Sequence, residues 1–496
     1  MRECVTILTG QAGIQIGDTF WDIIRAEHGI ETDGKFDDQC NRNENETIDT
    51  MFNEASRDGY YVPRTVMVDN DPSVIDHILS GPKGKNLFSS RMTVTGTEDA
   101  ANNFSRGYYT LSSKILPPTI DVIRKSVELC DSFQGFQMFN SFGGGTGSGF
   151  SARLIDQLEL MLNGDKCQRL EFNVFPSPRL STAIVEPYNA LFRAHHSLER
   201  SNCMFLFDNE ACYEICRRQL DVERAHYAHI NQLISLVASS VTASTRFSGP
   251  LNVDLAEFET NLVPYPRIHF PSASYAPISN PCCQPFNQPI KTLTQACFES
   301  RNRMIKYYSS STLQSKHRQQ QDSGKYITCC LLYRGDCTPK EVNASMIDLK
   351  QHEHFVNWSP AGMKCGIASE PPRMLEDIAQ TNRAVCALSN HTGMVECWRL
   401  LCRKFDLMYK KRAFVHWYVS EGMEEMEFNE AREDLECLID DYMEIDRTSS
   451  EMASFDTMEE IQMNKKTTNG DVNKNGTIEN GHHDGDNDDV IINDDL

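Results

Sequence analysis

The segment at 140–150, NSFGGGTGSGF, contains five glycines in seven consecutive residues. It follows the apolar run GFQMF, which is typical of a strand, and it precedes SARLIDQLELML, which has a helical pattern. Ordering a glycine costs backbone entropy, so a dense cluster between ordered elements indicates a loop whose backbone approaches a ligand closely. A strand, a glycine loop and a helix N-terminus together suit a phosphate. The alternative is a flexible surface turn that binds nothing.

Two common phosphate-binding motifs do not fit this loop. A Walker loop ends in Gly-Lys-Ser/Thr, whereas this loop ends in Gly149-Phe150 without a lysine. In a dinucleotide motif G-x-G-x-x-G that starts at Gly143 or Gly145, the third glycine falls on Ser148 or Phe150. A phosphate site here therefore requires a third design.

Apolar strand-like runs alternate with helical patterns through residues 1–208, which predicts an α/β domain with a parallel sheet. Ligands of such sheets lie beyond the carboxyl ends of the strands. Six polar loops follow the predicted strands and are expected to share one edge of the sheet: residues 10–13, 69–72, 98–103, 141–149, 176–186 and 208–210.

The rest of the chain divides by pattern. Residues 209–391 read as a second, smaller mixed α/β domain, with a polar insertion at about 309–324. Residues 392–446 contain two amphipathic patterns that predict a helical hairpin. Residues 447–496 are expected to form a disordered acidic tail, because their last part is rich in Asn, Asp and Gly and poor in core-forming residues.

Composition and charge narrow the functional classes. No apolar run is long enough for a membrane helix, and the first residues are too polar for a secretory signal, so we expect a cytoplasmic chain with reduced thiols among its 18 cysteines. The net charge is −22, and the segment 421–496 holds 24 acidic and 5 basic residues. This distribution disfavours nucleic acid as a partner and favours basic proteins, although a merely solubilising tail is an equal alternative.

Side-chain chemistry suggests roles in the predicted loops. Asp71 and Asp99 are candidates to hold a Mg²⁺ ion beside a phosphate, although Asp71 before Pro72 is equally well explained as a helix N-cap. The amides of Asn209 and Asn231 are suited to a base or ribose edge. The Tyr227 ring is suited to stacking on a purine, with buried packing as the alternative.

The segment NVDLAEF at 252–258 places two carboxylates, Asp254 and Glu257, in an otherwise apolar stretch. A general base or a water-positioning group is one interpretation. The long helical pattern before it would carry this segment to the opposite end of the nucleotide domain. It is therefore expected to act on the nucleotide of a neighbouring subunit in a head-to-tail stack.

The glycine loop and the segment NVDLAEF resemble those of the tubulin family. The resemblance extends over about residues 1–446 and includes GQAGIQIG, EDAANNFSRG, EPYNALF, LFDNEACYEICRR, VPYPRIHF and FDLMYKKRAFVHWYVSEGMEE. Glu257, where β-tubulins carry lysine, and the long loop before Arg383 resemble α-tubulins. The resemblance implies a site that binds Mg²⁺ and a GTP that does not exchange. It also implies a heterodimer with β-tubulin, in which Glu257 acts in the hydrolysis of the β-bound GTP. It also implies microtubules of the cytoplasmic cytoskeleton, with motors and microtubule-associated proteins at the acidic C-terminus.

By motif position, the resemblance assigns metal binding to Asp71. It assigns nucleotide contacts to Gly10, Gln11, Ala12, Gln15, Asp71, Asp99, Ala100, Asn102, Ser141, Gly144, Gly145, Thr146, Gly147, Thr182, Glu186, Asn209, Tyr227 and Asn231.

Several segments depart from the family pattern. Asp71 stands where the family has glutamate, the loop at 37–46 lacks the lysine that is acetylated in many α-tubulins, and the chain ends in Asp-Asp-Leu rather than Glu-Glu-Tyr. The lateral-contact segment at 279–289 and the insertion at 309–324 also differ. Two alternatives therefore stay open beside the structural subunit: a GTP-binding paralogue that does not enter microtubules, and a self-contained GTPase.

Overall fold

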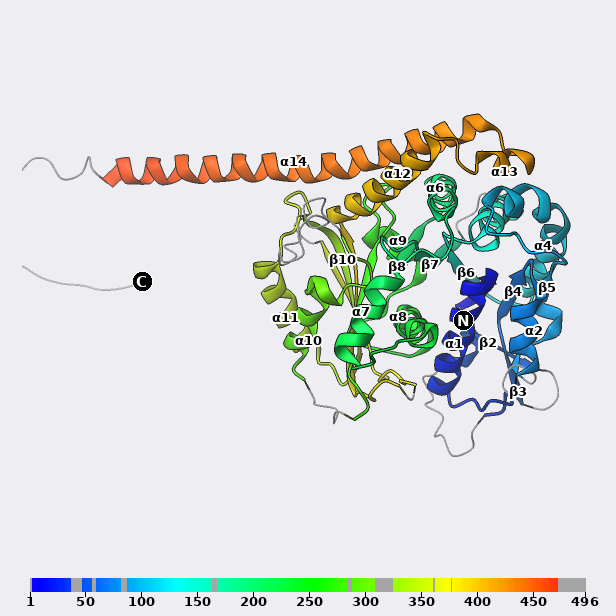
Figure 1. Ribbon diagram of the computed structural model, residues 1–496. Helices are drawn as coiled ribbons and strands as arrows, with labels where there is room; N and C mark the ends of the chain where they lie inside the picture. The colour runs from blue at the N-terminus through cyan, green and yellow to red at the C-terminus, as the bar shows by residue number, and fades with distance from the viewer. Residues whose placement is uncertain are drawn as a thin grey trace, which may run out of the picture. The chain divides into compact units, whose positions relative to one another are not determined.

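The computed structural model describes residues 2–36, 47–55, 59–81, 87–162, 167–282, 288–307, 324–359, 362–375 and 377–471 (Figure 1). Residues up to Asp446 form one compact unit, and those from Arg447 form another. The predicted departures at 37–46, in most of the insertion at 309–324 and in much of 279–289 lie outside the described residues. None of the described helices combines the length and apolar character needed to cross a membrane.

The first half of the compact unit alternates strands and helices, as the sequence pattern predicts. Its elements are β1 (Glu3–Thr9), α1 (Gly10–Glu27), β2 (Phe52–Ala55), β3 (Tyr60–Pro63), β4 (Thr65–Asp69), α2 (Pro72–Ser80), β5 (Thr93–Thr95), α4 (Ser112–Glu128), β6 (Phe133–Ser141), α5 (Ser151–Met161), β7 (Gln168–Phe175), α6 (Glu186–Ser197), β8 (Cys203–Asp208), α7 (Asn209–Gln219) and α8 (Tyr227–Arg246). Short π-helical turns, η3 (Arg106–Leu111) and η4 (Thr146–Phe150), precede α4 and α5.

The second half supplies α9 (Leu255–Leu262), β9 (Ser272–Ala276), α10 (Ile290–Phe298), β10 (Tyr326–Gly335), α11 (Pro339–His352), β11 (Met363–Ala368), β12 (Arg383–His391), α12 (Val395–Tyr409), α13 (Val415–Ser420) and α14 (Glu425–Asp471). Within the described residues, ten strands form one sheet in the order β11-β10-β12-β9-β8-β7-β6-β1-β4-β5. The strands from β5 to β9 are parallel, and β12 is antiparallel to β9 and β10. The predicted α/β fold is confirmed.

The predicted domain boundaries at 208 and 391 stay predictions. The sheet is continuous across the first of them, because β8 pairs with β9 through Leu206 and Ser272. Strand β9, from the second predicted domain, is thus added to the sheet beside β8 and parallel to it.

The two faces of the sheet are covered by different helices, in line with the alternation of side chains along a strand. In β1, Val5 and Ile7 belong to a buried cluster that includes Ile123 of α4 and Leu154 of α5. Leu8 points to the opposite face and belongs to a cluster with Phe20 of α1 and residues of α8. Helices on both faces leave the carboxyl ends of the parallel strands as the edge where loops gather.

A buried charge cluster joins the two halves of the compact unit. Glu27, at the end of α1, binds Arg246 of α8 at 2.6 Å and Arg334 of β10 at 2.7 Å. The Ser239 hydroxyl donates to the same carboxylate at 2.8 Å. All three charged side chains are buried. Burial alone would raise the pKa of Glu27, but the two guanidinium groups outweigh it and lower that pKa to about 2.

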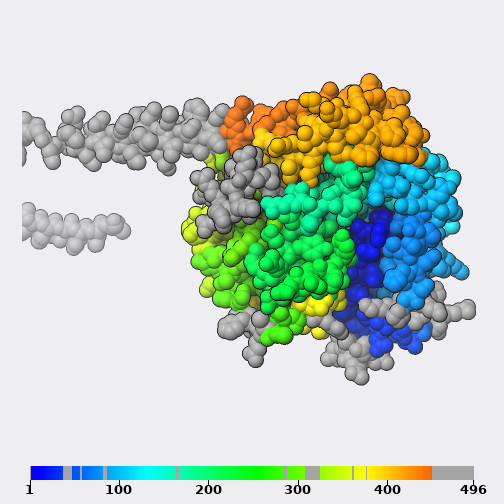
Figure 2. Space-filling view, viewed as in Figure 1, coloured from blue at the N-terminus to red at the C-terminus, as the bar shows by residue number. Residues whose placement is uncertain are grey.

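The C-terminal helices, meaning α12, α13 and the part of α14 up to Asp446, lie along one side of the compact unit, over α6 (Figures 1 and 2). Trp398 and Phe405 of α12 and Phe428 of α14 are buried in a cluster with Tyr188 and other residues of α6. The predicted break at 420–422 is present between α13 and α14. Helix α14 continues to Asp471, beyond the predicted end of the helical part at Asp446, because proline and glycine are absent from the sequence until Gly470. Residues 472–496 of the predicted tail lie outside the described residues.

Candidate functional site

A cavity of about 530 Å³ opens at the carboxyl ends of the parallel strands. All six predicted loops contribute to it, which follows from the parallel order of β5, β4, β1, β6, β7 and β8. All the predicted nucleotide residues except Ala100 line this cavity: Gly10, Gln11, Ala12, Gln15, Asp71, Asp99, Asn102, Ser141, Gly144, Gly145, Thr146, Gly147, Thr182, Glu186, Asn209, Tyr227 and Asn231. Ala100 is buried behind the glycine loop.

The glycine loop is packed tightly between two other loops. Gly10 has a φ of +72°, and a Cβ added there would lie 3.0 Å from the Gly147 nitrogen. A Cβ on Gly145 would lie 2.7 Å from the Ala100 Cβ and 2.8 Å from the Asn103 nitrogen. The loop therefore needs glycine because neighbouring backbone occupies the space of a side chain.

Gly145→Ala is expected to force the loops at 98–103 and 141–149 apart and to abolish nucleotide retention. Gly144→Ala is the matched control for the protein's own packing, because its Cβ would meet only the Ser141 hydroxyl, at 3.5 Å. The melting temperature without added nucleotide separates the two cases: Gly145→Ala is expected to lower it, and Gly144→Ala to leave it unchanged. Equal melting temperatures for the two variants would refute the packing argument.

Backbone N–H groups supply the positive potential of the cavity. Helices α1, α2, α7 and α8 and the turn η4 begin at residues that line the cavity or directly adjoin its lining. Helix N-termini carry partial positive charge and unpaired N–H donors, which favour anions. None of the described residues that line the cavity is a lysine or an arginine. Phosphate charge would therefore be balanced here by helix ends and by a bound cation.

Three carboxylates line the side of the cavity near β4 and β5: Asp69, Asp71 and Asp99. Burial raises the pKa of Asp69 to about 7, and the neighbouring carboxylates of Asp71 and Asp99 add to this shift. Among the described residues no cluster of three His, Cys, Asp or Glu side chains forms a closed metal site. Mg²⁺ in nucleotide sites is commonly held by one or two carboxylates together with phosphates, so this donor set fits that ion.

Asp71 is the N-cap of α2 and also lines the cavity, while its metal-binding role stays a prediction. Its carboxylate caps α2 by accepting the Ser73 backbone N–H at 3.1 Å and the Ser73 hydroxyl at 2.6 Å. These hydrogen bonds lower the pKa of Asp71 and keep it ionised. The same side chain lines the cavity, so the cap fixes a charged oxygen at its wall.

The opposite end of the cavity is formed by amides and one aromatic ring. Asn209 begins α7, Asn231 lies in the first turns of α8, and Tyr227 begins α8. Tyr227 is 52% exposed, so buried packing does not explain it; its ring lies 6.5 Å from that of Tyr213 and keeps exposed surface that suits stacking on a planar ligand.

Glu186 lines the cavity but its carboxylate is already bonded within the protein. One oxygen accepts the Thr182 N–H at 3.0 Å and the Thr182 hydroxyl at 2.7 Å, and the other accepts the Ser181 hydroxyl at 2.7 Å. Glu186 therefore shapes the loop at 176–186, and its predicted contact with the nucleotide stays a prediction.

Some lining residues were not predicted individually as site residues. They are Ile16, Asp69, Ser73, Val74, Gly143, Val174, Phe175, Pro176, Ser177 and Leu180. Asp69 and Ser177 are polar residues at or just after strand ends, a signal that could have identified them. The apolar members carry no such signal, because they look like ordinary core residues in the sequence.

Glu257 lies near the amino ends of the parallel strands, whereas the cavity lies at their carboxyl ends. Its neighbour Asp254 contacts Arg2, which precedes β1, whereas Gly10, which follows β1, lines the cavity. Seven strand residues at about 3.3 Å each separate these ends by roughly 20 Å. Glu259 of the same helix accepts a hydrogen bond from Asn202 at 3.0 Å, just before β8, which gives the same placement.

The Glu257 carboxylate is half-buried and forms an ion pair with a lysine. Lys364 of β11 approaches it to 2.5 Å, and both side chains are 34% exposed. The lysine thus fixes a carboxylate that keeps partial exposure to solvent.

Two family models match the chain. The GTPase domain of the Tubulin/FtsZ family matches residues 3–217, and the tubulin C-terminal domain matches residues 266–403. Together they cover more than two thirds of the chain. The GTPase match contains the glycine loop and most of the cavity, and the second match contains Lys364.

Proposed function

Because this chain belongs to the Tubulin/FtsZ family of GTP-binding cytoskeletal proteins, we propose that it is an α-tubulin-like subunit whose cavity holds a non-exchangeable GTP. The observation that carries the proposal is the cavity itself. Six loops that are distant in the sequence place N–H donors, hydroxyls, amides and carboxylates around a single space, and the start of α8 adds the Asn231 amide and the Tyr227 ring. That combination matches the parts of a nucleotide: phosphates, ribose and base.

Each end of the cavity suits one end of GTP. The backbone N–H groups of 143–147 and the hydroxyls of Ser141 and Thr146 donate to the phosphates. Asn70 donates to the Thr146 hydroxyl at 2.9 Å, which leaves that hydroxyl's own proton for the ligand. Asp71 and Asp99 are placed to hold a Mg²⁺ ion, whose charge offsets that of the phosphates.

The amide end is suited to guanine. Asn209 and Asn231 each offer a donor and an acceptor, which can pair with the mixed edge of that base, and Tyr227 can cover its face.

Hydrolysis is assigned to Glu257 acting in trans. Its distance from the cavity of its own chain argues against a self-contained GTPase. In a head-to-tail stack, the side of one subunit that holds the amino ends of its strands meets the side of the next that holds the carboxyl ends. Glu257 would then face the nucleotide of a β-tubulin partner. There it would orient or deprotonate the attacking water, while Lys364 fixes its carboxylate.

The proposed setting is the microtubule. β-Tubulin is the proposed partner in the heterodimer and along the lattice, and motors and microtubule-associated proteins are proposed to bind the acidic C-terminal part. The sequence departures at 279–289 and 309–324 favour one alternative, a GTP-binding paralogue that stays outside the lattice.

Co-expression of a tagged full-length chain with β-tubulin distinguishes these possibilities. We expect the tagged chain to label microtubules and to pellet with polymer, and to leave the pellet when the polymer is depolymerised. A typical α-tubulin with the same tag is the control. A folded, GTP-loaded chain that stays in the supernatant would reject the structural-subunit proposal in favour of the paralogue.

A further inference from the structure

We propose that Asn189 is a positioning residue that locks two loops of the cavity together and links them to the C-terminal helices through Tyr418. The two are the loops at 98–103 and 141–149, here called the phosphate loops. This inference rests on the proposed nucleotide function of the cavity. Asn189 lies in α6, does not line the cavity and is buried. Its effect on a ligand is therefore exerted through the loops that it holds.

All four hydrogen-bonding positions of the Asn189 amide are used. Its Nδ2 donates to the carbonyl oxygens of Gly143 at 2.8 Å and Asn102 at 2.7 Å, one in each phosphate loop. Its Oδ1 accepts the Phe104 N–H at 3.0 Å and the Tyr418 hydroxyl at 2.6 Å. A buried amide with two donors and two acceptor positions is fully satisfied by this arrangement.

This arrangement is specific to asparagine. Aspartate cannot donate to the two carbonyls, leucine of similar shape provides no hydrogen bonds, and glutamine is longer by one carbon. Loss of the amide would leave the part-buried carbonyls of Gly143 and Asn102 without this partner, and removing one partner of a hydrogen bond costs free energy. The two loops would no longer be held at the separation that their N–H donors need for a phosphate.

Tyr418 connects this amide to the C-terminal helices. It is buried in α13, and its backbone carbonyl accepts the Ser105 hydroxyl at 2.8 Å. The carbonyl of Trp417 accepts the Asn103 side-chain amide at 3.0 Å. Arg106 binds Glu98 at 2.8 Å and Glu421 at 3.8 Å. The segment Trp417–Glu421 is thus anchored on the residues that follow Asn102.

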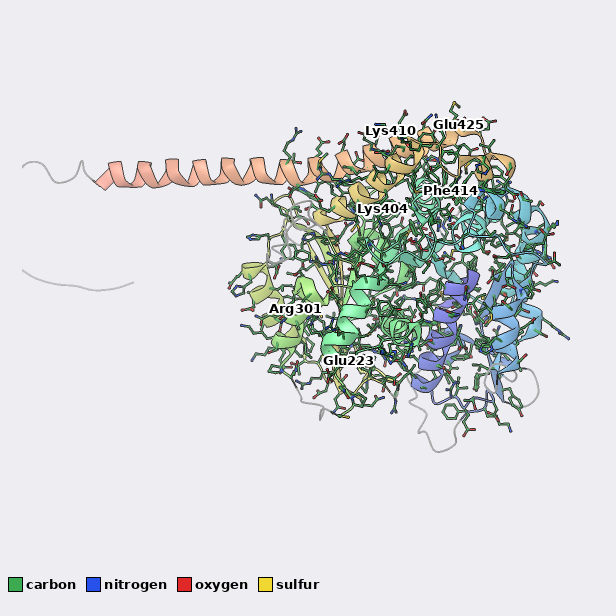
Figure 3. All side chains as sticks on the ribbon, in the orientation of Figure 1. Glu223, Arg301, Lys404, Lys410, Phe414 and Glu425 are labelled. Atoms are coloured by element: carbon green, nitrogen blue, oxygen red, sulfur yellow. The ribbon has the colours of Figure 1, made fainter. Side chains whose placement is uncertain are left out.

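A second contact comes from α12. Lys404, labelled in Figure 3, donates to the backbone carbonyls of Pro178 at 2.8 Å and Ser177 at 3.3 Å, in the loop that also lines the cavity. Helices α12 and α13 therefore both contact loops of the cavity, each a different one. A ligand that orders these loops must stabilise the docking of α12 and α13, and by linkage their docking must strengthen ligand binding.

Tyr418→Phe isolates this connection, because it removes one hydroxyl and keeps the buried ring. Tyr442→Phe is the matched control: Tyr442 of α14 is equally buried in the same cluster, and its hydroxyl does not belong to the Asn189 group. The first measurement is the release rate of labelled GTP from the full-length chain in its purified complex. Loss of one such hydrogen bond predicts release about fivefold faster in Tyr418→Phe and an unchanged rate in Tyr442→Phe.

The second measurement separates positioning from general stability. Protease cleavage between α13 and α14 is compared in the complex with its bound GTP and in the same complex after the nucleotide has been stripped. GTP is expected to protect the wild-type chain and Tyr442→Phe, and to protect Tyr418→Phe and Asn189→Asp much less. A chain in which Tyr418→Phe only lowers the melting temperature, with release and protection unchanged, would overturn the inference. A wild-type chain that carries no guanine nucleotide would instead reject the proposed function.

Discussion

Microtubules assembled with Glu257→Ala are expected to hydrolyse the GTP of the neighbouring β subunits about 100-fold more slowly or worse. The reason is that a carboxylate acting as general base or water-positioning group is removed, while the cavity of the mutated chain, roughly 20 Å away, stays intact. The measurement is phosphate release per polymerised subunit, together with the GTP and GDP content of the polymer. The variant polymer should retain GTP and depolymerise more slowly.

Glu259→Gln is the matched control. Glu259 lies two residues further in α9, but its carboxylate accepts a hydrogen bond from Asn202 of its own chain. Its substitution is expected to leave hydrolysis in the polymer unchanged. Undiminished phosphate release from Glu257→Ala polymer would rule out the trans mechanism.

Glu27→Gln is expected to lower the free energy of unfolding at neutral pH by about 3–5 kcal/mol. The substitution keeps the side-chain volume but leaves Arg246 and Arg334 buried without their carboxylate. Because these residues come from α1, α8 and β10, the loss loosens the contact between the two halves of the compact unit. Urea denaturation followed by circular dichroism provides the comparison. Glu128→Gln on the surface of α4, whose partner Arg124 is exposed, should cause no measurable change.

The stabilising effect of Glu27 should depend on pH in a defined direction. Its pKa in the folded chain is about 2, below the ordinary value of 4.5. A lowered pKa contributes stability that is complete above the ordinary value and is lost as the pH falls from about 4.5 towards 2. The difference between wild type and Glu27→Gln should therefore be constant from pH 7 to about pH 5 and shrink below it. A difference that grows on acidification would contradict the assignment.

The edge at which the site forms was predictable from the sequence, because parallel strands place their following loops together. The spacing of apolar residues along the chain predicted β1, β4, β6, β7 and β8 and the helices after them. Polar residues at the ends of these strands then indicated most of the residues that line the cavity. The amide end was predictable for a similar reason, since Asn209 directly follows a strand.

Contacts between distant parts of the chain were not predictable in this way. Asn189 binds residues 102, 104, 143 and 418, and Glu27 binds residues 246 and 334. In the sequence Asn189 reads as one polar residue in a helix, and only the packing of α6 between the phosphate loops and α13 gives it four partners. The continuity of the sheet from β8 to β9 likewise depends on packing that periodicity does not record.

The central claim, that the cavity holds GTP, is tested most directly by the nucleotide content of the full-length chain. The chain is purified with its partner and denatured, and the released nucleotides are identified by chromatography. The wild-type complex should release one GTP for each copy of this chain in addition to the partner's nucleotide. The double substitution Asn209→Ala and Asn231→Ala should lose that GTP and keep the partner's. A double variant that still carries the additional GTP, or a wild-type chain that carries an adenine nucleotide in its place, would contradict the account.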